Sequence, residues 1–184
     1  MNEVPAVAVV LTPVASASAL AGLCAMQDVD VHVVPSRSGA VAVVDLEPAT
    51  EPAAEEATAE PKDWDIAELL GTPGQEVPPA ADQAARTLSR LTKAGVVLIT
   101  SALTTDSGVE HGLSGQLTAR RYEGGEPGDD VPVGLVLAGA DDVVEDLVLG
   151  RVRAADVTGH QRSGDLPRWK AARMFAKGLR KPRP

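Results

Sequence analysis

Hydrophobic residues along this chain follow two kinds of pattern. Continuous apolar runs at residues 6–11, 40–44 and 96–100 are typical of short strands that are buried on both faces. Residues 29–34 instead alternate between valines and more polar positions, which is typical of a half-exposed strand at the edge of a sheet. The four segments together predict a sheet with a buried centre and an amphipathic edge.

Two helical segments separate these strands. Residues 15–27 place leucines at helical spacing among small residues, and Ser16 or Ser18 can cap the first turn. A second helix begins at Pro78-Pro79 and is stopped by Gly95. Its predicted buried stripe consists of Ala81, Ala84, Ala85, Leu88 and Leu91.

The order of these six elements is that of the ferredoxin-like βαββαβ motif. Further strands are expected at 116–122 and 131–137, with a turn at 123–130 between them and a helix capped by Asp141 after them. The two extra strands would cover the apolar fourth strand of the motif. The predicted fold is therefore α+β, with ferredoxin-like βαββαβ order, an additional ββα unit and a C-terminal amphipathic helix.

The length of 184 residues is that of one domain. Residues 47–65 contain seven acidic residues against one lysine and few large apolar side chains, so we expect an acidic disordered insertion. Residues 1–46 and 66–150 would form a single α+β domain, and residues 151–184 a basic C-terminal tail.

Charge is distributed unevenly along the chain. The net charge is −9, yet residues 151–184 carry ten Lys and Arg against two Asp. The rest of the chain carries seven basic against 24 acidic residues. This asymmetry indicates either an anionic partner for the tail or a contact between the tail and the acidic body.

The tail contains an expected helix over residues 166–181. On a helical wheel one side is apolar, formed by Trp169, Ala172, Phe175, Ala176 and Leu179. Another side is basic, formed by Lys170, Arg173, Lys177, Arg180 and Lys181. Such a helix lies on an anionic membrane, binds nucleic acid phosphates or docks in the groove of a partner. Alternatively, Trp169 and Phe175 cover the acidic body of the same chain.

The sequence favours a non-catalytic binding or adaptor protein whose C-terminal helix engages RNA, a ribonucleoprotein or an acidic protein surface. The expected binding residues are Trp169, Lys170, Arg173, Phe175, Lys177, Arg180 and Lys181. RNA binding would depend on the tail alone, because Tyr122 is the sole aromatic residue on any predicted strand.

The alternative is a small enzyme with its site in the polar loop 104–115. That loop contains Asp106, Glu110, His111 and Ser114. Catalytic residues, a metal site and a cofactor are not assigned, because the three histidines lack metal-ligand spacing and no phosphate-binding glycine motif occurs. Cys24 falls on a predicted buried helix face, where a thiol is usually inert.

No apolar run is long enough to predict a transmembrane helix. The segment Met1-Asn2-Glu3 contains an acid and no Lys or Arg, which argues against an export signal. We therefore expect a cytoplasmic protein. Its abundance of Ala, Val, Asp and Arg is typical of a GC-rich bacterial genome.

Overall fold

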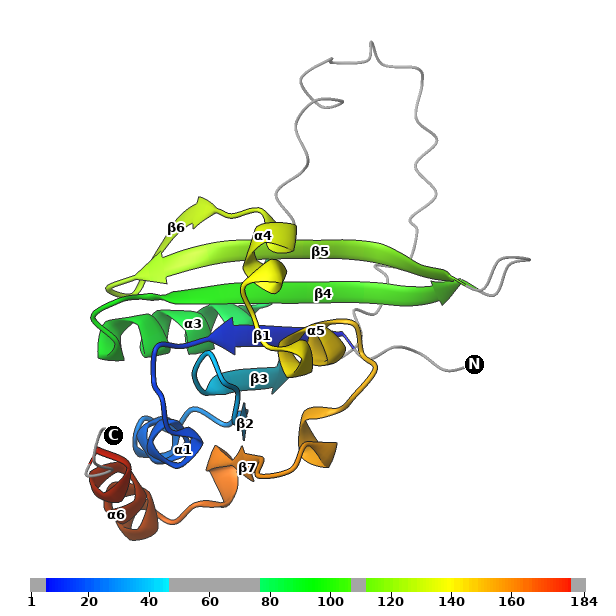
Figure 1. Cartoon of the computed structure of the whole chain (residues 1–184). Helices are drawn as coiled ribbons and strands as arrows, with labels where there is room; N and C mark the ends of the chain where they lie inside the picture. The colour runs from blue at the N-terminus through cyan, green and yellow to red at the C-terminus, as the bar shows by residue number, and fades with distance from the viewer. Residues whose placement is uncertain (1–5, 47–76, 107–111, 180–184) are drawn as a thin grey trace, which may run out of the picture.

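A seven-stranded antiparallel sheet forms the centre of the computed structural model, which describes residues 6–46, 77–106 and 112–179 (Figure 1). The strands are β1 (Val7–Leu11), β2 (His32–Val34), β3 (Val41–Asp45), β4 (Val96–Asp106), β5 (Gly112–Glu123), β6 (Glu126–Asp130) and β7 (Gln161–Arg162). The described α-helices are α1 (Ala17–Met26), α3 (Pro79–Leu91), α4 (Val133–Ala138), α5 (Asp142–Val148) and α6 (Arg168–Leu179). The expected α+β class is confirmed, with a sheet larger than the ferredoxin-like motif.

The order of the strands is β6-β5-β4-β1-β3-β2-β7. β1 lies in the middle, where Val9 pairs with Val43 of β3 and with Ile99 of β4. Helices cover both faces of the sheet, so the central strands have no solvated side. This explains their continuous apolar runs, since alternation marks a strand with one wet face.

One face of the sheet is covered by α1 and α3 (Figure 1). Leu20 and Cys24 from α1 and Leu88 from α3 are fully buried against this face. The expected stripe of α3 is correct except at its end, because Leu91 is 38% exposed in the last turn. Ser16 caps α1 by accepting a hydrogen bond from the backbone N–H of Ala19.

The opposite face is covered by α4 and α5, with Leu147 of α5 buried against the valines of β1 and β3. Asp141 occupies the N-cap position of α5, as expected from the sequence. Its side chain, however, accepts a hydrogen bond from the backbone N–H of Arg37 and makes no capping hydrogen bond. The aspartate therefore joins α5 to the turn before β3.

Two predictions in the region after β5 are wrong. Residues 131–137 do not form a strand, because Val133–Ala138 is the helix α4. The strand that pairs with β5 at this edge of the sheet is instead β6, which lies inside the expected turn after Gly124-Gly125, both of which have positive φ. A short apolar run does not distinguish a strand from a helix, and here the polar β6 pairs with β5 at the edge of the sheet.

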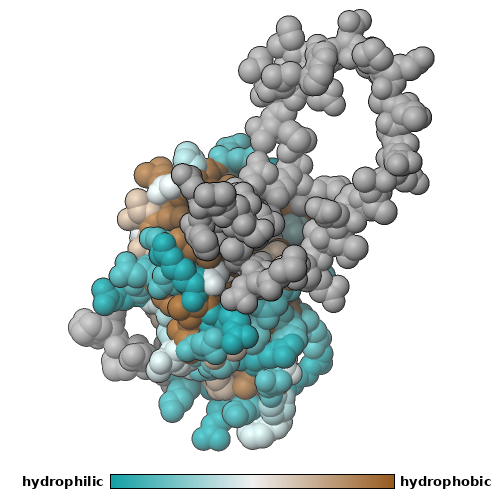
Figure 2. Space-filling model, turned by 90° about the vertical axis from the view of Figure 1, so that its right-hand side faces the viewer, coloured by the Kyte–Doolittle hydropathy of each residue, from teal (hydrophilic) through white to brown (hydrophobic). Residues whose placement is uncertain are grey.

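The C-terminal segment belongs to the domain. β7 pairs with β2, so the strand expected at the sheet edge is covered by residues from far along the chain. Ser163, which is buried, accepts a hydrogen bond from the backbone N–H of Val31 and donates one to the carbonyl of Val29. Figure 2 shows mostly hydrophilic residues over the lower part of the face that it views, whereas hydrophobic residues gather higher up on that face. The acidic insertion expected at 47–65 lies outside the described residues.

Candidate functional site

The C-terminal helix α6 packs along α1 (Figure 1). The two helices are in backbone contact where Gly22 of α1 meets Ala171 of α6. A Cβ on Gly22 would lie 2.5 Å from the carbonyl oxygen of Ala171 and 3.1 Å from the backbone nitrogen of Phe175. Such closeness requires small residues on both helices, because the distance between packed helices is set by the side chains between them.

The buried side of α6 differs from the side expected from the helical wheel. Ala171 is fully buried, and Met174 and Phe175 are half-buried beside it. Trp169 and Ala172, which the wheel placed with Phe175, are exposed. A helical wheel predicts the buried side of a helix from hydrophobicity alone. Here the buried side of α6 is the one whose small residue, Ala171, fits closely against the glycine and alanine surface of α1.

The outward side of α6 carries the residues of interest. The side chain of Trp169 is 69% exposed, and Arg173 follows it by one helical turn on the same side. Lys170 and Lys177 are exposed as well. These four residues, Trp169, Lys170, Arg173 and Lys177, are called the α6 outer face below. Arg180 and Lys181 lie outside the described residues.

The other described basic residues of the C-terminal segment pair with carboxylates of the same chain. The pairs are Arg151 with Glu145 and Asp146, Arg153 with Asp156, Arg162 with Asp30, and Arg168 with Asp28. Among the residues that the structure describes, the three cations of the α6 outer face form no such pair. Within the described part of the C-terminal segment, the positive charge that has no carboxylate partner therefore lies on the α6 outer face.

Two of these pairs fix the position of the segment that leads into α6. Arg162 binds both oxygens of Asp30 at 3.1 and 2.9 Å, and the backbone N–H of Gly164 donates to the same carboxylate. The hydrogen bond from Arg162 is the main reason that the pKa of Asp30 is lowered. Arg168, in the first turn of α6, donates to Asp28 at 2.6 Å.

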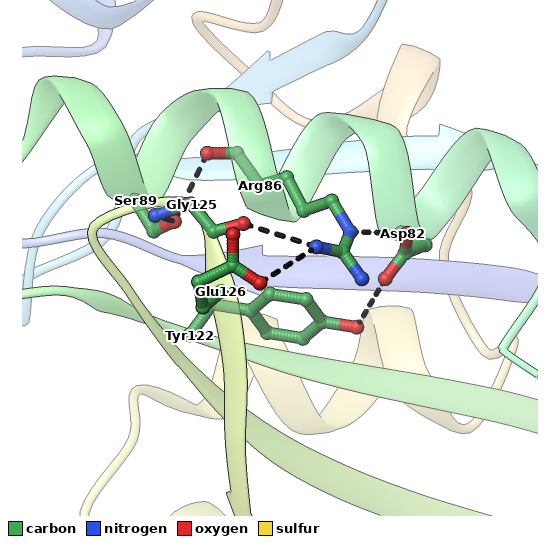
Figure 3. Close-up of polar contacts among 6 residues, drawn as sticks. All are labelled: Asp82, Arg86, Ser89, Tyr122, Gly125 and Glu126. Carbon is green, nitrogen blue, oxygen red and sulfur yellow. Dashed lines mark hydrogen bonds and ion pairs between the residues drawn. The ribbon is translucent and has the colours of Figure 1, made fainter.

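A polar cluster joins α3 to the turn from β5 to β6 (Figure 3). The buried Tyr122 donates its hydroxyl hydrogen to Asp82, which also accepts from Arg86. Arg86 donates further to the carbonyl of Gly125 and to Glu126. These contacts hold the turn against α3. In the sequence, only the spacing of Asp82 and Arg86 by four residues indicates one of them, because residues four apart on a helix can form an ion pair.

Burial and bonding perturb two groups of this cluster in opposite directions. Burial raises the pKa of the Asp82 carboxyl, but the hydrogen bonds from Arg86 and Tyr122 outweigh it, and the net pKa is lowered. Burial and the hydrogen bond to Asp82 raise the pKa of Tyr122 to about 12. A carboxylate already bound by two donors and a phenol that stays protonated are features of a structural cluster.

The loop expected at 104–115 is in part a hairpin. β4 continues to Asp106 and β5 begins at Gly112, and the two strands pair along this whole length. Ser114 pairs with Thr104 in this ladder, whereas Glu110 and His111 lie outside the described residues. Cys24 is buried in α1, and burial raises the pKa of its thiol to about 12, so it is not a nucleophile.

The described residues contain no group of three or more His, Cys, Asp or Glu side chains that could hold a metal ion. None of the described helices has both the length and the apolar character needed to span a bilayer. Comparison with protein-family models, with curated proteins and with solved structures gives no match.

Proposed function

We propose that this chain is a non-catalytic binding protein and that the α6 outer face engages an anionic macromolecule. The observation that most directly supports this proposal is that Trp169 is exposed beside Arg173, on a helix whose opposite side packs against α1. The exposed indole ring offers a partner a flat apolar surface for stacking. The exposed cations around it favour a partner with negative charge.

Single-stranded RNA fits the α6 outer face better than an acidic protein surface does. Lysine and arginine neutralise phosphates, and an aromatic ring stacks on an exposed base whatever its sequence. An acidic protein would use the three cations but would gain no stacking from Trp169. Because the whole chain carries a net charge of −9, binding would be local to this face and strongly weakened by salt.

The anchoring of α6 supports this proposal. The contact between Gly22 and Ala171 and the ion pair between Arg168 and Asp28 fix the rotation of the helix about its axis. The outer face is thereby held toward solvent before any partner arrives, which reduces the entropy lost on binding. An RNA partner would place the protein in the bacterial cytoplasm.

We further propose that the fold is an extended ferredoxin-like one. The order β4-β1-β3-β2 within the larger sheet supports this, as does the position of α1 after β1 and of α3 after β3. On this view β5, β6 and β7 are additions at the two edges. The additions at the β7 edge lead directly into α6.

Fluorescence of Trp169 tests RNA binding directly. The chain has two tryptophans, so the substitution Trp64→Phe leaves Trp169 as the only indole reporter. Titration with a single-stranded oligouridylate at low salt is expected to quench Trp169, because stacking on a base quenches an indole ring. The variant Lys170→Gln/Arg173→Gln in the same background is expected to bind about tenfold more weakly, with a salt dependence shallower by about 1.4 in log–log slope.

The matched control is Arg37→Gln/Lys93→Gln, which removes the same charge from exposed positions away from α6. Its affinity for the oligouridylate should equal that of the parent. Equal weakening by both double variants would mean that only the overall charge matters and would overturn the proposed face. Binding to polyglutamate but not to oligouridylate would overturn RNA as the partner in favour of an acidic protein.

A further inference from the structure

A second site of different character lies on the sheet face that α5 covers. A cavity of about 310 Å³ is enclosed by β1, β3, α5 and the 3₁₀ turn Ala154–Asp156. Its floor is apolar and is formed by buried residues, namely Val7, Val43, Leu147 and Ala154. An apolar cavity of this size with a few polar groups is the usual form of a small-molecule site.

The first polar group of this cavity is a histidine–aspartate pair. The Nε2 of His32 lies 3.3 Å from the Oδ2 of Asp45, and both side chains line the cavity. The imidazole is 15% exposed and the carboxylate 72% exposed. One carboxylate oxygen of Asp45 thus lies beside His32, and the exposed carboxylate is accessible to solvent and to a ligand.

The imidazole ring of His32 packs against that of His160, and the two ring centroids are 5.8 Å apart. The Nδ1 of His32 is buried and has no hydrogen-bond partner among the described residues. Burying a polar atom without a hydrogen-bond partner costs free energy, and such atoms often occur at functional sites.

The second polar group is a cation. Arg153 lines the same cavity, and its Nε lies 3.2 Å from Asp156. Its two terminal nitrogens make no hydrogen bond with any described residue. The residues around the cavity therefore include one exposed carboxylate, that of Asp45, and one exposed guanidinium group, that of Arg153, beside an apolar floor.

We propose that this cavity binds a small zwitterionic ligand, an α-amino acid with an aliphatic side chain. The ammonium group would bind Asp45, the carboxylate would bind Arg153, and the side chain would lie on the apolar floor. The cavity volume of about 310 Å³ lies at the small end of the range for ligand pockets, which suits a ligand of the size of valine or leucine. Charged hydrogen bonds at both ends would set the orientation of the ligand.

The aliphatic amino acid site is independent of the α6 outer face. Its residues come from β1, β2, β3, α5 and the segment after α5, whereas α6 packs on α1 across the sheet. Loss of RNA binding would leave the amino acid site intact, and the reverse also holds.

Titration of the full chain with L-leucine, followed by amide chemical shifts in NMR spectra, tests this proposal. We expect saturable shifts confined to the residues around the cavity at ligand concentrations of about 10 mM or below. Asp45→Asn and Arg153→Gln should each weaken binding about tenfold or more, since each removes one charged hydrogen bond. The controls Asp129→Asn and Arg37→Gln remove the same charges from exposed positions elsewhere and should bind as the parent does.

Two partial ligands separate the contributions of the rim. Isoamylamine keeps the ammonium and the side chain, isocaproate keeps the carboxylate and the side chain, and each should bind more weakly than L-leucine. All four substitutions affect exposed side chains, so the fold should persist, and circular dichroism checks that it does. The absence of saturable shifts with L-leucine, or shifts that Asp45→Asn and Arg153→Gln leave unchanged, would overturn the proposal. Binding of isocaproate as tight as that of L-leucine would overturn the zwitterionic ligand.

Discussion

Gly22 in α1 and Ala171 in α6 are packed so closely that the two helix backbones are in direct contact. The position that a Cβ on Gly22 would occupy is only 2.5 Å from the carbonyl oxygen of Ala171. A real Cβ would collide with backbone there, and a backbone carbonyl cannot rotate away as a flexible side chain can. This single contact fixes which side of α6 is buried and which side carries Trp169.

Substitution Gly22→Ala is expected to destabilise the protein by about 1–3 kcal/mol, the usual cost of overpacking a tight contact. This loss would occur although alanine favours a helix over glycine by about 1 kcal/mol. Gly134→Ala in α4 is the control, because a Cβ there meets nothing within 4 Å. Urea unfolding measures both. A Gly22→Ala variant at least as stable as the parent would contradict the observed packing of α6 on α1.

The change in the stability of the protein with pH below about pH 4 should depend on Asp82. Its pKa in the folded chain is lowered from the ordinary value of about 3.9. A lowered folded-state pKa stabilises the protein above the unfolded-state pKa, and this stabilisation is lost as the pH falls through the folded-state pKa. Asp82→Asn should therefore be less stable than the parent at pH 7, and the difference should shrink on acidification. Thermal unfolding at a series of pH values measures this, and a constant difference would contradict it.

Ser163 is expected to be essential for holding the C-terminal segment on β2. In Ser163→Ala the backbone N–H of Val31 loses its bond to the serine hydroxyl in a buried place, which costs about 1–3 kcal/mol. The exposed Ser38→Ala is the control and should change stability by less than about 0.5 kcal/mol. Amide hydrogen exchange should show faster opening of β7 in the first variant, and unchanged exchange there would refute the assigned role.

The single thiol should be unreactive in the folded protein. Cys24 is fully buried and burial raises its pKa to about 12, so little thiolate forms at pH 8 and reagent cannot reach it. Modification by a disulfide reagent such as dithionitrobenzoate is expected only after urea unfolds the chain. Fast modification without denaturant would show that α1 opens readily.

Local pattern was sufficient for the elements at the centre of the fold. The continuous runs that became β1 and β3, the Pro-Pro start of α3 and the aspartate before α5 are all where the sequence placed them. Each depends on neighbours in the chain: uninterrupted apolar side chains, a residue that tolerates the first helical turn, and a capping position. Such features act over a few residues and are readable from the sequence.

The pattern failed where two distant segments compete for the same place. Residues 131–137 are apolar like those of β1, yet residues 133–138 form α4, and the polar segment Glu126–Asp130 pairs with β5 at the edge of the sheet. The same limit applies to the amino acid site, since nothing near His32 in the sequence indicates Asp45 or Arg153. The residues that line the cavity come from several separate segments and meet only after folding.

The sequence by itself determined the α+β class, the buried centre of the sheet and the concentration of basic residues after position 150. These follow from hydrophobic periodicity and charge, which are properties of short stretches of chain. Only the tertiary structure brought Arg162 and Arg168 to Asp30 and Asp28, which lie far away in the sequence, whereas the pairs of Arg151 and Arg153 are local. It also decided that Trp169 faces outward. Helices pack through the surfaces that fit most closely, and the side of α6 that fits against Gly22 is the side with the small residue Ala171.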